Sequence, residues 1–172
     1  MGAYQLAEIT VGLIESAVRQ NIATTLATLR VDRNNPIVTT EPPREYFQYE
    51  SAHVYRAPAI FTIIKNMDIR DSVKNANYIN SLCEVIVACV VEDRLERLVT
   101  VKAWRYQAAL MPILHQVTLT NSDHTVKLFS RVQNCEFSGI INLKNENAPD
   151  AVFRKEVSLR LQVEHAENLE GI

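Results

Sequence analysis

The most constraining stretch of the sequence is Glu156–Glu164, because its side chains alternate strictly between apolar and polar. The apolar set is Val157, Leu159, Leu161 and Val163, and the polar set is Glu156, Ser158, Arg160, Gln162 and Glu164. A period of two places the two sets on opposite faces of a β-strand, which is typical of an antiparallel sheet with one face in water. We therefore expect Leu159 and Leu161 to point inward. Arg160 and Gln162 should face solvent or a channel.

Two earlier segments, residues 59–69 and 79–93, are also predicted to be strands, since both are rich in β-branched and other apolar residues. The centre of the second, Val85–Val91, is apolar at every position. That pattern predicts a central strand covered on both faces.

The C-terminal third of the chain continues in β character. Residues 116–133 predict two strands joined by the polar turn Asn121–His124, and residues 136–145 resemble a further strand. Residues 145–151 are predicted to be a loop, and residues 165–172 a loose tail.

Two helices are expected. Residues 3–29 carry apolar side chains at steps of three and four, and a second helix should follow Asp93, which is suited to be its N-cap. The predicted buried stripe of that second helix is Leu95, Leu98, Val99, Tyr106, Ala109, Leu110 and Ile113. Trp104 lies off the stripe and predicts a second apolar face, packed on the sheet or on a neighbouring subunit.

Together these patterns predict an α+β fold, with a mainly antiparallel sheet, a long N-terminal helix and a second helix packed on the sheet. The length of 172 residues predicts a single domain over residues 1–172.

Residues 31–58 form a long arm, predicted to be extended because it holds Pro36, Pro42, Pro43 and Pro58. Within it, residues 36–40 are expected to make a short edge strand. Clustered aromatic side chains in such a segment must be buried somewhere. Two interpretations stay open, the chain's own core and a second protein chain. The candidate partner-binding residues are Arg44, Tyr46, Phe47, Tyr49, Tyr55 and Arg56.

The sequence offers little support for nucleotide binding, metal binding or catalysis. Four glycines are too few and too scattered for a GxGxxG or GxxxxGK[ST] phosphate loop. The four histidines and three cysteines show no metal-binding spacing, so no metal and no cofactor is expected. A nucleophilic Cys135 with His115 or His165 is a weaker interpretation than a buried thiol. The adjacent acids at the start of the second helix, Glu92 and Asp93, are explained by the helix dipole.

Charge and composition bear on whether nucleic acid or a membrane is a partner. A net charge of −2 argues against nucleic-acid binding by the whole chain, and no apolar run is long enough to span a membrane. Three cysteines without a pairing pattern indicate synthesis in a reducing cytoplasm.

The order of elements resembles the tail terminator and neck proteins of tailed bacteriophages. The matching segments are the opening helix at 6–29, the long arm at 33–60, the strand at 83–93, the helix at 94–114 and the closing strand at 157–167. The resemblance implies a virion protein, made in the host cytoplasm, that forms a homo-oligomeric ring, usually a hexamer, where the tail meets the head. It also implies contacts with the tail tube and neck or connector proteins, with DNA only passing through the lumen, and no catalysis.

Two other classes of function remain as alternatives. A small enzyme with a site outside the known motifs would need a deep pocket with convergent polar groups. A monomeric peptide-binding module would need a sheet edge that accepts an extended partner.

Overall fold

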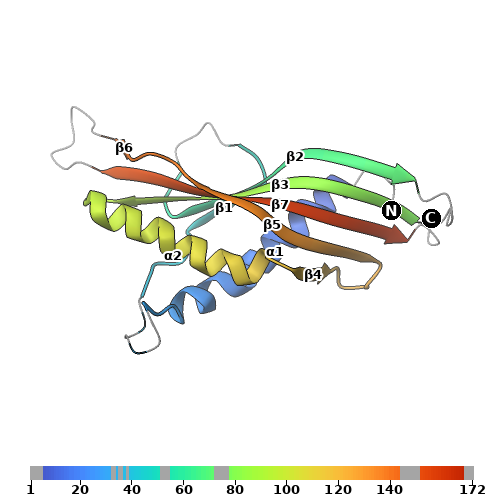
Figure 1. Ribbon diagram of the computed structural model, residues 1–172, viewed down its shortest axis with the longest axis horizontal. Helices are drawn as coiled ribbons and strands as arrows, with labels where there is room; N and C mark the ends of the chain where they lie inside the picture. The colour runs from blue at the N-terminus through green and yellow to red at the C-terminus, as the bar shows by residue number, and fades with distance from the viewer. Residues whose placement is uncertain are drawn as a thin grey trace.

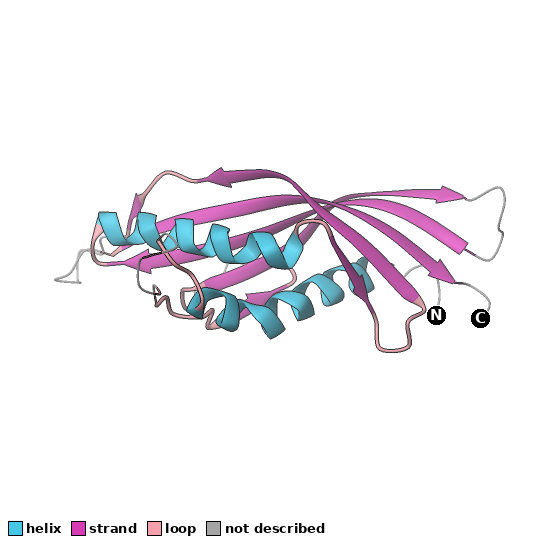
Figure 2. Ribbon diagram, turned by 60° about the horizontal axis from the view of Figure 1, so that its bottom comes forward, coloured by secondary structure: helices cyan, strands magenta, loops and turns pink. Residues whose placement is uncertain are grey.

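The computed structural model describes residues 6–31, 34, 37, 39–50, 55–71, 78–143 and 152–168, with backbone alone at 70–71, 78–80 and 165–168. Its elements, in chain order, are α1 (Leu6–Ala27), β1 (Glu45–Phe47), β2 (Ala59–Asp71), β3 (Tyr78–Asp93), α2 (Glu96–Leu114), β4 (Val117–Thr120), β5 (Val126–Phe137), β6 (Ile141–Asn142) and β7 (Phe153–Asn168). Both helices lie on one face of a seven-stranded sheet (Figures 1 and 2). The α+β prediction is confirmed.

The sheet has the strand order β1-β2-β3-β7-β5-β4, and β6 pairs with the start of β7. All of these pairs are antiparallel except β1 with β2. The pairing of β2 with β3 skips Lys65, and that of β5 with β7 skips Gln133, so each of β2 and β5 contains a bulge. Bulges increase the local twist, which helps long strands curve around the helices.

The alternation in β7 is observed as the sequence predicts. Leu159 and Leu161 are fully buried on the helix side, Arg160 is exposed and Gln162 is half-buried. The expected register is therefore confirmed, and burial of the apolar set supplies much of the stabilisation of this strand.

β3 is apolar on both faces, of which one is covered by the helices and the other is covered in part. Val85, Val87, Cys89 and Val91 join the core beneath the helices. Ala88 and Val90 lie on the opposite face in a smaller cluster with Ala59 and Phe61, against which Phe47 and Tyr55 pack. The arm thus covers part of the sheet face that carries no helix.

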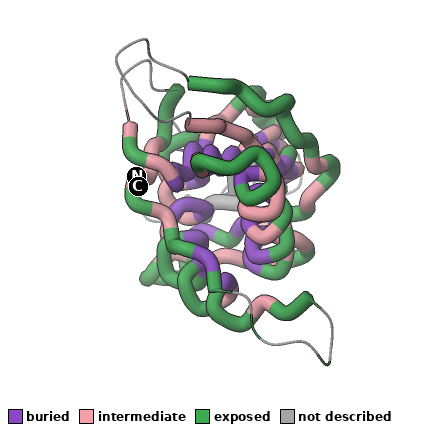
Figure 3. Tube along the Cα trace, turned by 90° about the vertical axis from the view of Figure 1, so that its left-hand side faces the viewer, coloured by how far each residue is buried: buried purple, intermediate pink, exposed green. Residues whose placement is uncertain are grey.

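The main core lies between the sheet and the helices, where Figure 3 shows the buried segments in purple. The buried residues of α2 are Val99, Ala103, Tyr106, Ala109, Leu110, Ile113 and Leu114. Leu95 and Leu98, predicted as part of this stripe, are 60% and 42% exposed. Leu95 precedes the helix in extended backbone, and Leu98 is turned about 100° from Val99, beyond the edge of the buried face.

Three local predictions are corrected. Asp93 is not the N-cap, because the helix begins at Glu96; the Asp93 carboxylate instead accepts the Leu95 N–H at 3.1 Å. Residues 36 and 38 lie outside the described residues; Ile37 forms an isolated bridge with Arg30, Thr39 and Thr40 lie in no strand, and the described edge strand of the arm is β1. The tail prediction is wrong over residues 165–168, which pair with β3 and largely with β5 and so have partners on both sides.

The turn at Asn121–His124 is confirmed between β4 and β5, with His124 at φ 57°. The predicted loop at 145–151 lies outside the described residues. In the part of the chain that the structure describes, neither helix has the length and apolarity needed to cross a bilayer.

Leu110→Ala is expected to lower the free energy of unfolding by about 2–5 kcal/mol, because Leu110 is fully buried in α2 and truncation leaves a cavity. Ile69→Ala is the control, a truncation of similar size at a position of β2 that is 55% exposed, and should cost less than about 1 kcal/mol. Chemical denaturation of both variants checks this. Equal losses would show that the buried face of α2 is misassigned.

Candidate functional site

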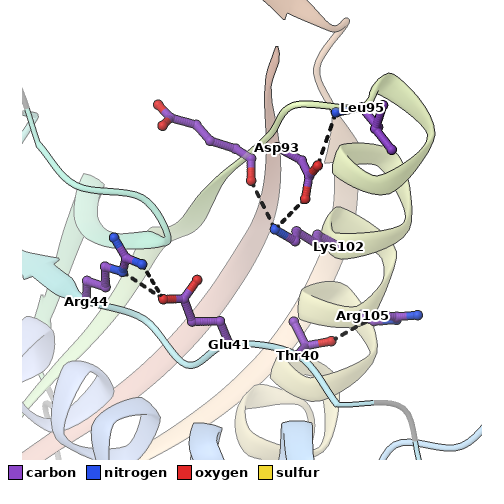
Figure 4. A network of polar contacts seen from close by, with 8 residues as sticks. Thr40, Glu41, Arg44, Asp93, Leu95, Lys102 and Arg105 are labelled. Atoms are coloured by element: carbon purple, nitrogen blue, oxygen red, sulfur yellow. Dashed lines mark hydrogen bonds and ion pairs between the residues drawn. The ribbon is translucent and has the colours of Figure 1, made fainter. Parts of the chain in front are cut away.

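The arm is anchored to α2 by a buried tyrosine. The Tyr106 hydroxyl donates a hydrogen bond of 2.5 Å to the carbonyl oxygen of Glu41, and its side chain has no solvent exposure. Beside it, Arg105 Nη1 lies 3.4 Å from Thr40 Oγ1 (Figure 4). Burial raises the pKa of Tyr106 far above its usual range. The hydroxyl therefore stays protonated and holds this part of the arm in place.

Three further contacts hold the two ends of the arm together next to β2. The Arg44 N–H donates to the Pro58 carbonyl at 2.7 Å. The Arg56 N–H donates to Glu45 Oε2 at 2.6 Å, and the Arg56 guanidinium lies 3.5 Å from Glu45 Oε1. Arg44 also pairs with Glu41 at 2.6 Å (Figure 4). Both arginine side chains remain largely exposed.

Tyr46 points to the helix side of the sheet and packs, half-buried, against the main core. The Arg19 guanidinium carbon lies 4.2 Å from the centre of its ring, and Arg19 is oriented by Glu15 at 2.7 Å. Burial raises the pKa of Tyr46, although the nearby Arg19 opposes this. Tyr46 therefore joins the edge strand β1 to α1.

Phe47 and Tyr55 lie on the opposite face, against β2. Phe47 stacks on Phe61 with ring centres 5.0 Å apart, and Tyr55 meets Phe61 edge-on at 5.1 Å. The Arg154 guanidinium carbon lies 4.9 Å from the Tyr55 ring. Tyr49 touches this group only through an edge contact of 5.8 Å with Phe47, and it is 61% exposed.

The six predicted residues thus divide into two sets. Tyr46, Phe47 and Tyr55 pack against their own chain. Arg44, Tyr49 and Arg56 present their side chains to solvent. Substitution of Tyr46 or Phe47 would disturb this internal packing, so tests of contact with a partner protein belong on Arg44, Tyr49 and Arg56.

Besides the exposed residues of the arm, apolar side chains are exposed at α2, and two of them, Leu95 and Leu98, were predicted to be buried. Leu95, Leu98 and Trp104, the last 56% exposed, lie on the solvent side of α2 and of the turn before it. The sequence did indicate an exposed apolar surface on this helix, because Trp104 lies off the buried stripe. Another exposed apolar set, Phe137, Ile140, Ile141 and Leu143, runs from the end of β5 into β6.

The side chains considered as catalytic candidates from the sequence include three that make hydrogen bonds or ion pairs within the fold: His115, Glu92 and Asp93. His115 Nδ1 accepts the Val132 N–H at 3.2 Å, and burial raises the pKa of the Cys135 thiol. Glu92 pairs with Arg154. Burial raises the pKa of Asp93, but hydrogen bonds from Lys102 and from the Leu95 N–H outweigh this and lower it overall.

No three His, Cys, Asp or Glu side chains within the described ranges come together in a way that could hold a metal ion. The recesses on the helix-free sheet face are open. One of about 320 Å³ has Phe61, Ile63 and Ile86 on its floor, and Tyr55 also lines it. Such a recess can accept a partner's side chain.

Comparison with known proteins finds no family model and no curated protein that matches the chain. Among solved structures, the chain matches a chain from the virion of a native gene transfer agent particle, with a TM-score of 0.35 and 12% sequence identity. The match covers 90% of this chain and 93% of the other.

Tyr106→Phe is expected to lower the free energy of unfolding by about 1–3 kcal/mol, because it leaves the Glu41 carbonyl without the hydroxyl that donates to it. Tyr49→Phe is the matched control at an exposed position, and its effect should stay within about 0.5 kcal/mol. Denaturant titrations measure both. A neutral Tyr106→Phe variant would mean that this bond does not anchor the arm.

Stability is expected to fall as pH rises above about 9. Burial raises the pKa values of two thiols and three phenols in the folded chain above their ordinary values of 9.0 and 10.0: Cys83, Cys89, Tyr46, Tyr55 and Tyr106. The unfolded chain therefore loses these protons first, and its ionisation draws the equilibrium toward unfolding. Denaturation midpoints measured from pH 7 upward test this, and constant midpoints through pH 11 would contradict it.

Proposed function

We propose that this protein is a structural component of a virion. Six copies form a ring at the head–tail junction, where the ring ends the tail tube and joins it to the head. Its partners are other copies of itself, the tail tube protein and the neck or connector proteins, and DNA only passes through the lumen. In this role the chain performs no catalysis and needs no cofactor or metal.

The observation that carries the proposal is the two-sided character of α2. One side of the helix is buried in the core, while Leu98 and Trp104 on its other side, and Leu95 just before it, stay largely exposed. Large apolar side chains left in water along one helix favour a contact with another protein, because burying them there is favourable. Tryptophan is enriched among the residues that dominate such contacts.

The polar face of β7 fits a passage for DNA that does not hold it. Arg160 pairs with Glu84 at 3.3 Å, and Gln162 is bonded to Gln133. A surface of paired charges and amides offers few unmatched cations to phosphate, so it would not retain a passing duplex. The order of helices, arm and strands is the further support, since it resembles that of tail terminator and neck proteins.

The double variant Leu98→Ser with Trp104→Ser is expected to remain folded and to lose assembly, because both side chains are exposed in the single chain. Light scattering after size exclusion should give the parent a mass six times the 19.5 kDa of the chain, and the variant the mass of one chain. Gln20→Ser, at an exposed position of α1, is the control and should keep the parent's mass.

Some rings assemble only on their tube, so the same proteins should also be added to purified tails lacking this component. Electron microscopy then shows whether a ring caps the tail. A parent that is monomeric alone and leaves the tails uncapped contradicts the proposal. A double variant that assembles as the parent does would remove α2 from the interface.

A further inference from the structure

The segment that joins β3 to the buried part of α2 carries two of the exposed apolar side chains of this surface. Every residue from Arg94 to Leu98 is exposed, and Val99 is the first buried residue of α2. Leu95 and Leu98 lie in this segment, whereas Trp104 lies further along the helix. The two leucines are therefore presented by a stretch of chain that adds no buried side chain to the core.

The first turn of α2 has no side-chain cap of its own. Leu95 is the N-cap residue, and its apolar side chain cannot accept a hydrogen bond from the helix. Its carbonyl oxygen accepts the N–H groups of Leu98 and Val99 at 3.0 and 3.1 Å. A helix end without a capping side chain is less stable, because its first N–H groups lack partners within the helix. The position of the Leu95 backbone therefore decides whether this turn is formed.

Asp93 and Lys102 hold that position together, as Figure 4 shows, and we call this pair the clamp. Asp93, at the end of β3, accepts the Leu95 N–H through Oδ1 at 3.1 Å and the Lys102 ammonium through Oδ2 at 2.7 Å. Lys102 also donates to the Glu92 carbonyl oxygen at 3.2 Å, which ties the second turn of α2 to the end of β3. The Asp93 and Lys102 side chains are 16% and 27% exposed, so water and salt screen them less than a surface pair.

The surroundings of Asp93 keep its carboxylate ionised. Burial raises the pKa of Asp93, but the hydrogen bond from Lys102, those from backbone N–H groups and the charge of Lys102 together lower it below its ordinary value of 3.8. On the β7 side, the nearby Arg154 is paired with Glu92. Asp93 is therefore charged at neutral pH, and the clamp is closed.

We infer that the clamp pre-organises the apolar surface of α2 for contact with a second copy of the chain, and that opening the clamp weakens assembly without unfolding the domain. The inference rests on the proposed ring and names the residues that control its formation. A loose segment must be ordered when it binds, and this ordering costs entropy. The clamp orders Leu95 and Leu98 beforehand, in the single chain. Because Trp104 lies outside the clamped turn, opening the clamp lowers the affinity and does not abolish it.

The test compares two substitutions of a carboxylate by an amide. Asp93→Asn removes the charge of the clamp, and the control Glu50→Gln removes that of another carboxylate–lysine pair, Glu50 with Lys65. Light scattering over a dilution series, or occupancy of purified tails over the same series, gives the dissociation constant of the assembly. Asp93→Asn should weaken assembly about tenfold at neutral pH, and Glu50→Gln should assemble as the parent does.

Hydrogen exchange of the ¹⁵N-labelled full chain, diluted until it is monomeric, locates the effect. The Leu98 and Val99 amides donate to Leu95 when the first turn is formed, so their exchange should become about tenfold faster in Asp93→Asn. Lys102→Met, which keeps the apolar stem of the lysine, should have the same effect. The Leu110 amide, in the buried part of α2, should exchange as in the parent.

An Asp93→Asn variant that assembles with the parent's affinity, or that keeps the parent's exchange rates at Leu98 and Val99, overturns the inference and leaves the ring proposal standing. A loss of stability as large as that of Leu110→Ala also overturns it, because Asp93 would then support the whole fold. A parent that assembles neither alone nor on tails contradicts the ring proposal, and the role of the clamp in assembly fails with it.

Discussion

The antiparallel pairing of β3 with β7 is the interaction on which the rest of the structure depends. Both strands have 16 residues and pair along their whole length, from Tyr78 opposite Asn168 to Asp93 opposite Phe153. α2 and three short or medium strands separate them in the sequence, so closing this contact costs chain entropy that only a large buried surface can offset. Their shared helix-side face, fully apolar at its centre, supplies that surface. β2 and β5 then pair with the two outer sides of the ladder.

Much of the fold could be predicted because its long elements carry clear periods. β7 was recognisable from strict alternation and β3 from an unbroken apolar run, and both are as expected. The errors fall where tertiary contacts override local pattern. Residues 165–168 resemble a tail in sequence but are strand, since β3 and much of β5 pair with them. Leu95 fits the helical stripe by spacing, yet the helix begins after it, so its side chain never joins the buried face.

The candidate site was harder to predict, because aromatic content alone does not say which face a side chain will meet. Tyr46 and Phe47 are neighbours in β1, so they point to opposite sides of the sheet, one toward Arg19 and the main core and the other toward Phe61. Tyr106 could be placed in the core from its spacing. Its bond to Glu41 could not be foreseen, because it joins residues 65 positions apart through a backbone carbonyl.

The bulges in β2 and β5 make these strands more tolerant of changes in length than β7 is. Lys65 and Gln133 each occupy a position with no residue opposite, so deleting either one leaves a regular strand whose remaining side chains keep their faces. In β7, every residue from Phe153 to Asn168 is paired with a residue of β3. A deletion at its centre would turn half of its apolar side chains to the wet face. Deletion of one residue is therefore expected to be tolerated at the bulges of the flanking strands, while the central ladder keeps a fixed length.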